Sequence, residues 1–73
     1  MSETITAAWV LKANKNDILK NRKLVENYLE IKEKTLEGMR EKTPDSFACS
    51  YAIYRKALLK IKECGMRWKL KKF

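Results

Sequence analysis

The chain contains no histidine, the side chain that most often serves as a general base or a metal ligand near neutral pH. Its two glycines form no glycine-rich phosphate loop. Cys49 follows apolar residues inside a predicted helix, away from the helix N-terminus that would activate a thiol. The sequence therefore predicts a protein that is not an enzyme, needs no cofactor or metal ion, and acts by binding.

Cysteine is also scarce, with Cys49 and Cys64 as the only two. Both fall on one predicted helix, where fifteen residues of rise would separate them by roughly 22 Å. The Cα atoms of a disulfide lie within about 7 Å of each other. We therefore expect two reduced thiols and a reducing compartment, namely the cytoplasm.

Long apolar runs are missing as well. The longest is Ala7–Leu11, far below the roughly 20 residues that cross a bilayer, so we expect no transmembrane segment. The start of the chain shows no basic stretch leading into an apolar one, so we also expect no signal peptide. At 73 residues the chain is expected to form a single small helical domain, 1–73, whose core alone stabilises it weakly. Association into a homodimer is slightly favoured over a monomer.

Apolar spacing predicts helices throughout, hence an all-α fold. Ile5, Ala8 and Trp9 share one helical face, which predicts a short helix over about 3–13 with Ser2 as its cap. A strand is the alternative, because Ile, Thr, Trp and Val also favour strands. Asn16 is then the expected N-cap of the next helix.

A long helix is predicted over about 17–42. Its apolar positions recur at helical spacing and occupy an arc of roughly 160°, wider than one neighbouring helix can cover. They are Ile18, Leu24, Val25, Tyr28, Leu29, Ile31, Leu36 and Met39. Gly38 weakens this helix locally, which indicates either fraying or close packing at that point.

Pro44 separates the long helix from the next, because proline suits the first turn of a helix and not its interior. With Thr43 as N-cap, a second long helix is predicted over about 44–64, ending before Gly65. The short connection favours an antiparallel hairpin, with a sharply angled corner as the alternative.

The last residues, 66–73, form a basic tail in which apolar and basic side chains alternate up to Leu70. Two conformations fit this pattern, an extended arm with one apolar side and a final helical turn. The tail is expected either to be mobile or to pack Trp68 on the edge of the bundle.

Positive charge is concentrated in the second half of the chain. Residues 44–73 carry eight basic and two acidic side chains, whereas residues 1–43 carry nine and seven. Lysine and arginine bind phosphates, and Trp68 and Phe73 could stack on bases, so we predict electrostatic binding of DNA or RNA. The same charge also suits solubility alone, an anionic membrane surface or an acidic protein. The predicted nucleic-acid-binding residues are Arg55, Lys56, Lys60, Lys62, Arg67, Trp68, Lys69, Lys71 and Lys72.

A row of glutamates is the second candidate surface. These side chains lie within roughly 80° of one another on the long helix, away from its apolar arc, and we expect them to face water. We call them the glutamate ridge: Glu26, Glu30, Glu33, Glu37 and Glu41. The alternative function is thus a protein-binding adaptor or inhibitor that occludes a larger partner with this ridge or with the apolar groove. Small lysine-rich proteins of this kind are often encoded by phages or mobile elements, although composition does not establish a source.

Overall fold

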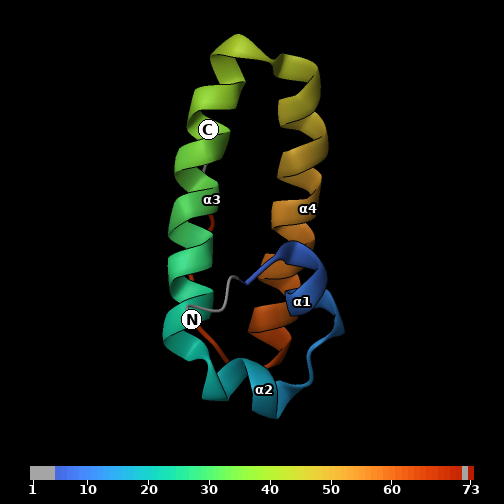
Figure 1. Ribbon diagram of the computed structural model, residues 1–73, viewed down its shortest axis with the longest axis vertical. Coiled ribbons are helices and arrows are strands. Elements are labelled where there is room, and N and C mark those ends of the chain that lie inside the picture. The colour runs from blue at the N-terminus through green and yellow to red at the C-terminus, as the bar shows by residue number, and fades with distance from the viewer. Residues whose placement is uncertain (1–4, 72) are drawn as a thin grey trace.

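A computed structural model describes residues 5–71 and 73 and shows an all-α architecture (Figure 1). The helices are α1 (Ala7–Lys12), α2 (Lys15–Lys20), α3 (Arg22–Lys42) and α4 (Pro44–Glu63). α3 and α4 run antiparallel and pack against each other, and α1 packs on α4. The predicted hairpin is confirmed, and the described residues contain no strand.

The first helix is shorter than the predicted span of about 3–13. Ile5 and Thr6 lie outside it, and Thr6 is the N-cap, because its extended backbone lets its hydroxyl accept a hydrogen bond of 3.2 Å from the Trp9 amide. Ala13 ends the helix in an extended conformation. The predicted cap at Ser2 lies outside the described residues.

The predicted single helix over about 17–42 is wrong in its first turns. It is divided at Asn21, whose backbone (φ −109°, ψ 29°) leaves the helical region and whose side-chain amide donates to the Asp17 carbonyl at 2.9 Å. The N-cap is Asn14 and not Asn16, since the Asn14 side chain accepts from the Asp17 amide at 2.8 Å. The break lets α2 turn across the end of the hairpin, where Ile18 is fully buried (Figure 1).

The turn between the long helices follows the prediction. Pro44 occupies the first turn of α4, and Thr43 is both the C-cap of α3 and the N-cap of α4. The Thr43 hydroxyl does not bond to the amides of α4; it lies 3.5 Å from the Met39 carbonyl, to which it donates.

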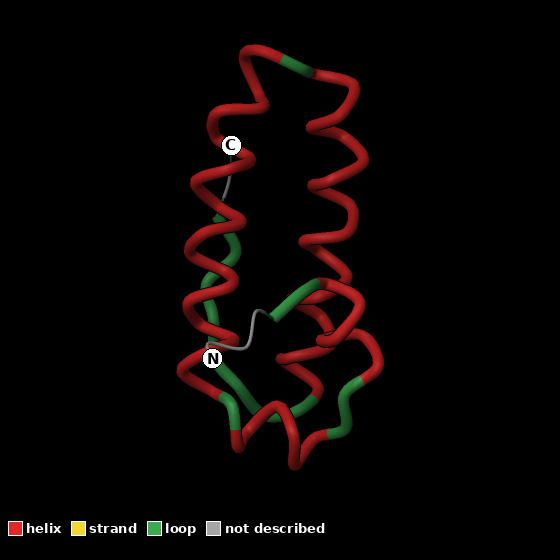
Figure 2. Tube along the Cα trace, in the orientation of Figure 1, coloured by secondary structure: helices red, strands yellow, loops and turns green. Residues whose placement is uncertain are grey.

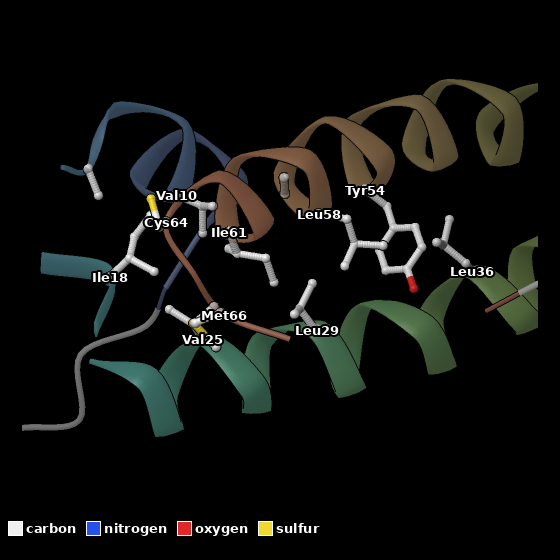
Figure 3. Packing of buried hydrophobic residues seen from close by; sticks show 12 residues of the cluster. Val10, Ile18, Val25, Leu29, Leu36, Tyr54, Leu58, Ile61, Cys64 and Met66 are labelled. Carbon is white, nitrogen blue, oxygen red and sulfur yellow. The ribbon is translucent and has the colours of Figure 1, made fainter. Parts of the chain in front are cut away.

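The core forms between α3 and α4 and continues under α1 and α2 (Figure 3). Ile61 projects from α4 into its centre, where Val10, Leu29 and Met66 come together around it (Figure 3). The buried residues come from every helix and from the chain after α4: Val10, Ala13, Ile18, Val25, Leu29, Leu36, Tyr54, Ala57, Leu58, Ile61, Cys64 and Met66. Cys49 and Cys64 are both free thiols, the first exposed and the second buried.

Candidate nucleic-acid interface

The chain reverses direction at Gly65, directly after α4. Gly65 has φ +91°, a conformation that residues with a Cβ rarely adopt. Its amide donates to the Lys62 carbonyl at 3.0 Å, and the Met66 amide donates to the Ile61 carbonyl at 3.0 Å. This pair of bonds is the Schellman arrangement that closes many helices. It turns the following residues back along α3 (Figure 2).

Residues 66–71 and 73 form an extended segment on the hairpin, which we call the C-terminal strap. Of the two conformations open from the sequence, the extended arm is therefore the one found. Met66 is buried, and Trp68, Leu70 and Phe73 are partly buried against the core. Arg67, Lys69 and Lys71 alternate with them and are exposed. The strap thus packs its apolar side chains and presents its cations.

A carboxylate on α3 holds the strap in place. One oxygen of Glu33, Oε2, accepts a hydrogen bond of 2.6 Å from the Tyr54 hydroxyl and one of 2.9 Å from the Trp68 indole N–H. The Lys71 amide lies 3.4 Å from the Tyr54 hydroxyl, to which it donates. Lys71 also forms an ion pair with Glu37 at 3.1 Å. Glu33 therefore links α3, α4 and the strap through a single atom.

The strap ends in an aromatic cluster on the first half of α4. The Phe73 ring meets Phe47, Tyr51 and Tyr54 edge-on, with centroid distances of 5.7, 5.8 and 6.4 Å. Phe47 and Tyr51 stack at 5.5 Å. These separations are in the favourable range for aromatic pairs. Phe73 is consequently packed against protein rings and is not presented to a base.

The predicted nucleic-acid-binding residues divide into three groups. Arg55, Lys56, Lys62, Arg67 and Lys69 are exposed, and no ion pair involves them among the described residues. Lys60 is half-buried, Lys71 pairs with Glu37, and Trp68 donates its N–H to Glu33. Lys72 lies outside the described residues.

Arg55 and Lys62 lie on one face of α4. Arg55 is one helical turn beyond Tyr51, which contacts Phe73, and Lys62 follows seven residues later on the same helical face. At 1.5 Å per residue the two are about 10 Å apart along α4. Arg67 and Lys69 are exposed on the strap, where they border the groove that Glu26 and Glu33 also line. We refer to Arg55, Lys62, Arg67 and Lys69 as the basic cluster.

The glutamate ridge does not face water along its whole length, contrary to the expectation from the sequence. Glu33 and Glu37 are bonded to the strap, and Glu26 and Glu33 border the open groove between α3 and the strap. Glu26 also lies 3.9 Å from Arg22. Glu30 and Glu41 are exposed.

The expectation that the glutamate ridge faces water failed because the ridge adjoins the apolar arc of α3, and the strap covers that border. The missed signal was the alternation in residues 66–70, which supplies the apolar side that binds there.

Two tyrosine hydroxyls are shielded from water. Burial, followed by the hydrogen bond to Glu33, raises the pKa of Tyr54 above its usual value. Burial alone raises the pKa of Tyr28, whose hydroxyl is enclosed without a hydrogen-bond partner in the part of the chain that the structure describes. Both tyrosines are therefore more easily ionised in the unfolded chain than in the folded one.

We expect alkaline pH to destabilise the fold through these tyrosines. Above about pH 10 the unfolded chain loses phenolic protons that the folded chain keeps, so the free energy of unfolding falls as pH rises. The loss reaches about 1.4 kcal/mol per pH unit for each fully protected phenol. Urea denaturation between about pH 8 and pH 11 measures it. Tyr54→Phe should reduce the slope. Tyr28→Phe should reduce the slope as well, because burial raises the pKa of Tyr28; an unchanged slope in both variants would contradict the assignment.

Among the described residues, no helix combines the length and apolar character needed to cross a membrane, and no three acidic or cysteine side chains are grouped as a metal site. Comparison of the chain with protein-family models, curated proteins and solved structures finds no match.

Proposed function

We propose that this chain binds the phosphate backbone of nucleic acid through the basic cluster. The observation that carries the proposal is the arrangement of the strap, which packs Trp68, Leu70 and Phe73 inward and leaves Arg67 and Lys69 exposed, while Arg55 and Lys62 are exposed on α4. Exposed cations without carboxylate partners release counterions from phosphates most effectively. The chain's net charge of +8 adds long-range attraction to a polyanion.

The mechanism we propose is electrostatic and independent of sequence. Base stacking would require exposed aromatic faces. Phe73 packs against α4, and Trp68 is partly buried with its N–H bonded to Glu33, so neither aromatic side chain of the strap is fully exposed for stacking. This supports contact with the backbone and favours duplex over single strands.

A salt titration tests the proposal. Four phosphate contacts predict that the logarithm of the association constant falls with the logarithm of salt concentration with a slope of about −3.6 for duplex DNA. Fluorescence anisotropy with labelled duplex and single-stranded oligonucleotides of DNA and RNA gives the slope. Absence of binding at about 50 mM salt, where such contacts are strong, would rule the function out.

Neutralising the strap cations locates the site. The double variant Arg67→Gln/Lys69→Gln should lower the magnitude of the salt slope by about 1.8 and weaken binding at least tenfold at low salt. The matched control, Lys23→Gln/Lys34→Gln, removes two exposed lysines from α3 and should lose much less affinity. Equal losses in both variants would mean that net charge alone attracts the nucleic acid and that the basic cluster is not a site.

The alternative of a protein-binding adaptor or inhibitor stays a prediction. Its glutamate ridge is partly engaged, because Glu33 and Glu37 already bind the strap. A partner would therefore meet Glu30 and Glu41 or would have to displace the strap.

A further inference from the structure

The side of α3 turned away from α4 and from the strap carries a stripe that residues 5–71 and 73 leave exposed. Leu24, Ile31 and Gly38 are spaced by seven residues and therefore lie within about 40° of one another on the helix. Leu24 is 38% exposed and Ile31 is 65% exposed. A Cβ added to Gly38 would meet no atom within 4 Å. Packing within the described part of the chain therefore gives no reason for a helix-weakening glycine at this position.

Charged side chains of alternating sign border this stripe along one edge. In order along α3 they are Lys23, Glu30, Lys34 and Glu41, and all four are exposed. At 100° per residue they fall within about 40° of one another, beside the stripe. Lys32 on the opposite edge is half-buried, and Glu33 and Glu37 on the strap side are already bonded.

The order of these charges is complementary to itself. If a second α3 lies antiparallel across the stripe with the two Ile31 side chains facing each other, Leu24 meets Gly38 of the second copy. In the same alignment Lys23 faces Glu41 of the second copy, and Glu30 faces its Lys34. A twofold axis makes every contact twice. Gly38 then has a role, because its missing side chain leaves room for Leu24.

We propose that two copies of this chain associate through the outer face of α3, antiparallel and centred on Ile31. The proposal does not depend on nucleic-acid binding, since the stripe and the basic cluster are different surfaces. From Leu24 to Gly38 the stripe is about 21 Å long. A stripe of this length on one helix buries less area than the roughly 800 Å² per partner of a standard complex. We therefore expect the dimer to dissociate on dilution.

Sedimentation equilibrium from about 10 μM to about 1 mM tests the dimer, because a complex whose dissociation constant lies between these concentrations changes from monomer to dimer across them. The wild-type chain should pass from monomer to dimer. Ile31→Glu places two carboxylates opposite each other on the axis and should leave a monomer throughout. Leu59→Glu is the matched control, since Leu59 is 60% exposed on α4 and outside the stripe. A wild-type monomer at every concentration, or equal effects of the two variants, would overturn the proposal.

Charge exchange tests the alignment. Lys34→Glu places a carboxylate opposite Glu30 of the second copy at both symmetry-related contacts. This repulsion should raise the dissociation constant of the dimer at least tenfold. Adding Glu30→Lys restores opposite charges and should recover most of the loss. Gly38→Leu should fold normally by circular dichroism, because open space surrounds Gly38, yet it should block the dimer. A dimer that tolerates Gly38→Leu, or a charge exchange without recovery, would show that another surface mediates association.

Discussion

Replacing Glu33 with alanine is expected to lower the free energy of unfolding by about 2–3 kcal/mol and to loosen the C-terminal strap. The Tyr54 hydroxyl and the Trp68 indole both donate to one Glu33 oxygen, and Tyr54 is fully buried. Hydrogen bonds to a charged acceptor contribute about 1.5–3 kcal/mol each, and a buried donor left without an acceptor costs about 1–3 kcal/mol. We place the sum at the lower end because Glu33 remains partly accessible to water.

Urea denaturation gives the change in stability, and Trp68 fluorescence reports the strap. Trp9→Phe provides the background, because it leaves Trp68 as the only tryptophan. Glu33→Ala should shift the Trp68 emission to longer wavelength before the main unfolding transition. Glu30→Ala is the matched control on the same helix; Glu30 is exposed, and its loss should cost less than about 0.5 kcal/mol. Identical behaviour of the two variants would mean that Glu33 does not anchor the strap.

Truncating Ile61 to alanine is expected to destabilise the chain further, by about 3–4 kcal/mol. Ile61 is fully buried where side chains of α1, α3 and the strap converge on α4 (Figure 3). Removing a buried isoleucine side chain to alanine costs about 2–5 kcal/mol, the higher values arising where neighbours cannot collapse into the space. Side chains from separate elements surround Ile61, so movement of one element into the vacated space would open a gap beside another.

This loss in the free energy of unfolding is large compared with the total stability of so small a domain. A core in a domain this small supplies roughly 3–5 kcal/mol in total, so Ile61→Ala should be largely unfolded at room temperature. Circular dichroism should show a loss of helix signal and of a cooperative thermal transition. Ile53→Ala, at 41% exposure on the same helix, should melt cooperatively with a small shift. A cooperative transition in Ile61→Ala close to that of Ile53→Ala would contradict the assignment of Ile61 to the centre of the core.

The long helices were predictable because their ends carry strong local signals. Pro44 suits only the first turn of a helix, and Gly65 adopts the positive φ that ends one, so α4 could be bounded within one residue of its observed end. The apolar spacing of Val25, Leu29 and Leu36 identified the buried side of α3. Local backbone chemistry at such positions has few alternatives, and tertiary contacts do not overrule it.

The break at Asn21 could not be predicted in the same way. Asparagine is tolerated inside helices, and its side chain ends one only when the surrounding fold favours the bend. Here the bend allows Ile18 to reach the core from α2. The break is stabilised by the burial of Ile18 against residues distant in the sequence. The residues around Asn21, by contrast, continue the helical spacing of apolar side chains.

The position of the strap was likewise nonlocal. Alternation in residues 66–70 identified an extended arm as one of two conformations, but nothing in that segment names Glu33 as its acceptor. The sequence pattern therefore predicts nucleic-acid contacts for Trp68 and Lys71 and a protein partner for Glu33 and Glu37. In the structure Trp68 donates to Glu33, and Lys71 forms an ion pair with Glu37. A row of glutamates and an aromatic-basic tail in one short chain can bind each other, and that pairing is the physical signal to weigh in similar sequences.

The distance along the chain between the groups that anchor the strap also bears on the order in which the fold assembles. The hairpin contacts of α3 and α4 begin at the tight connection around Thr43, whereas Trp68 is 35 residues from Glu33. Closing a longer loop costs more chain entropy, so we expect the hairpin to form before the strap closes. The strap is held by side chains more than by a backbone hydrogen-bond ladder, and it can open while the hairpin persists. Such an opening would uncover Glu33 and the aromatic rings of α4 together, giving the chain a second, partly open state that competes with its closed form.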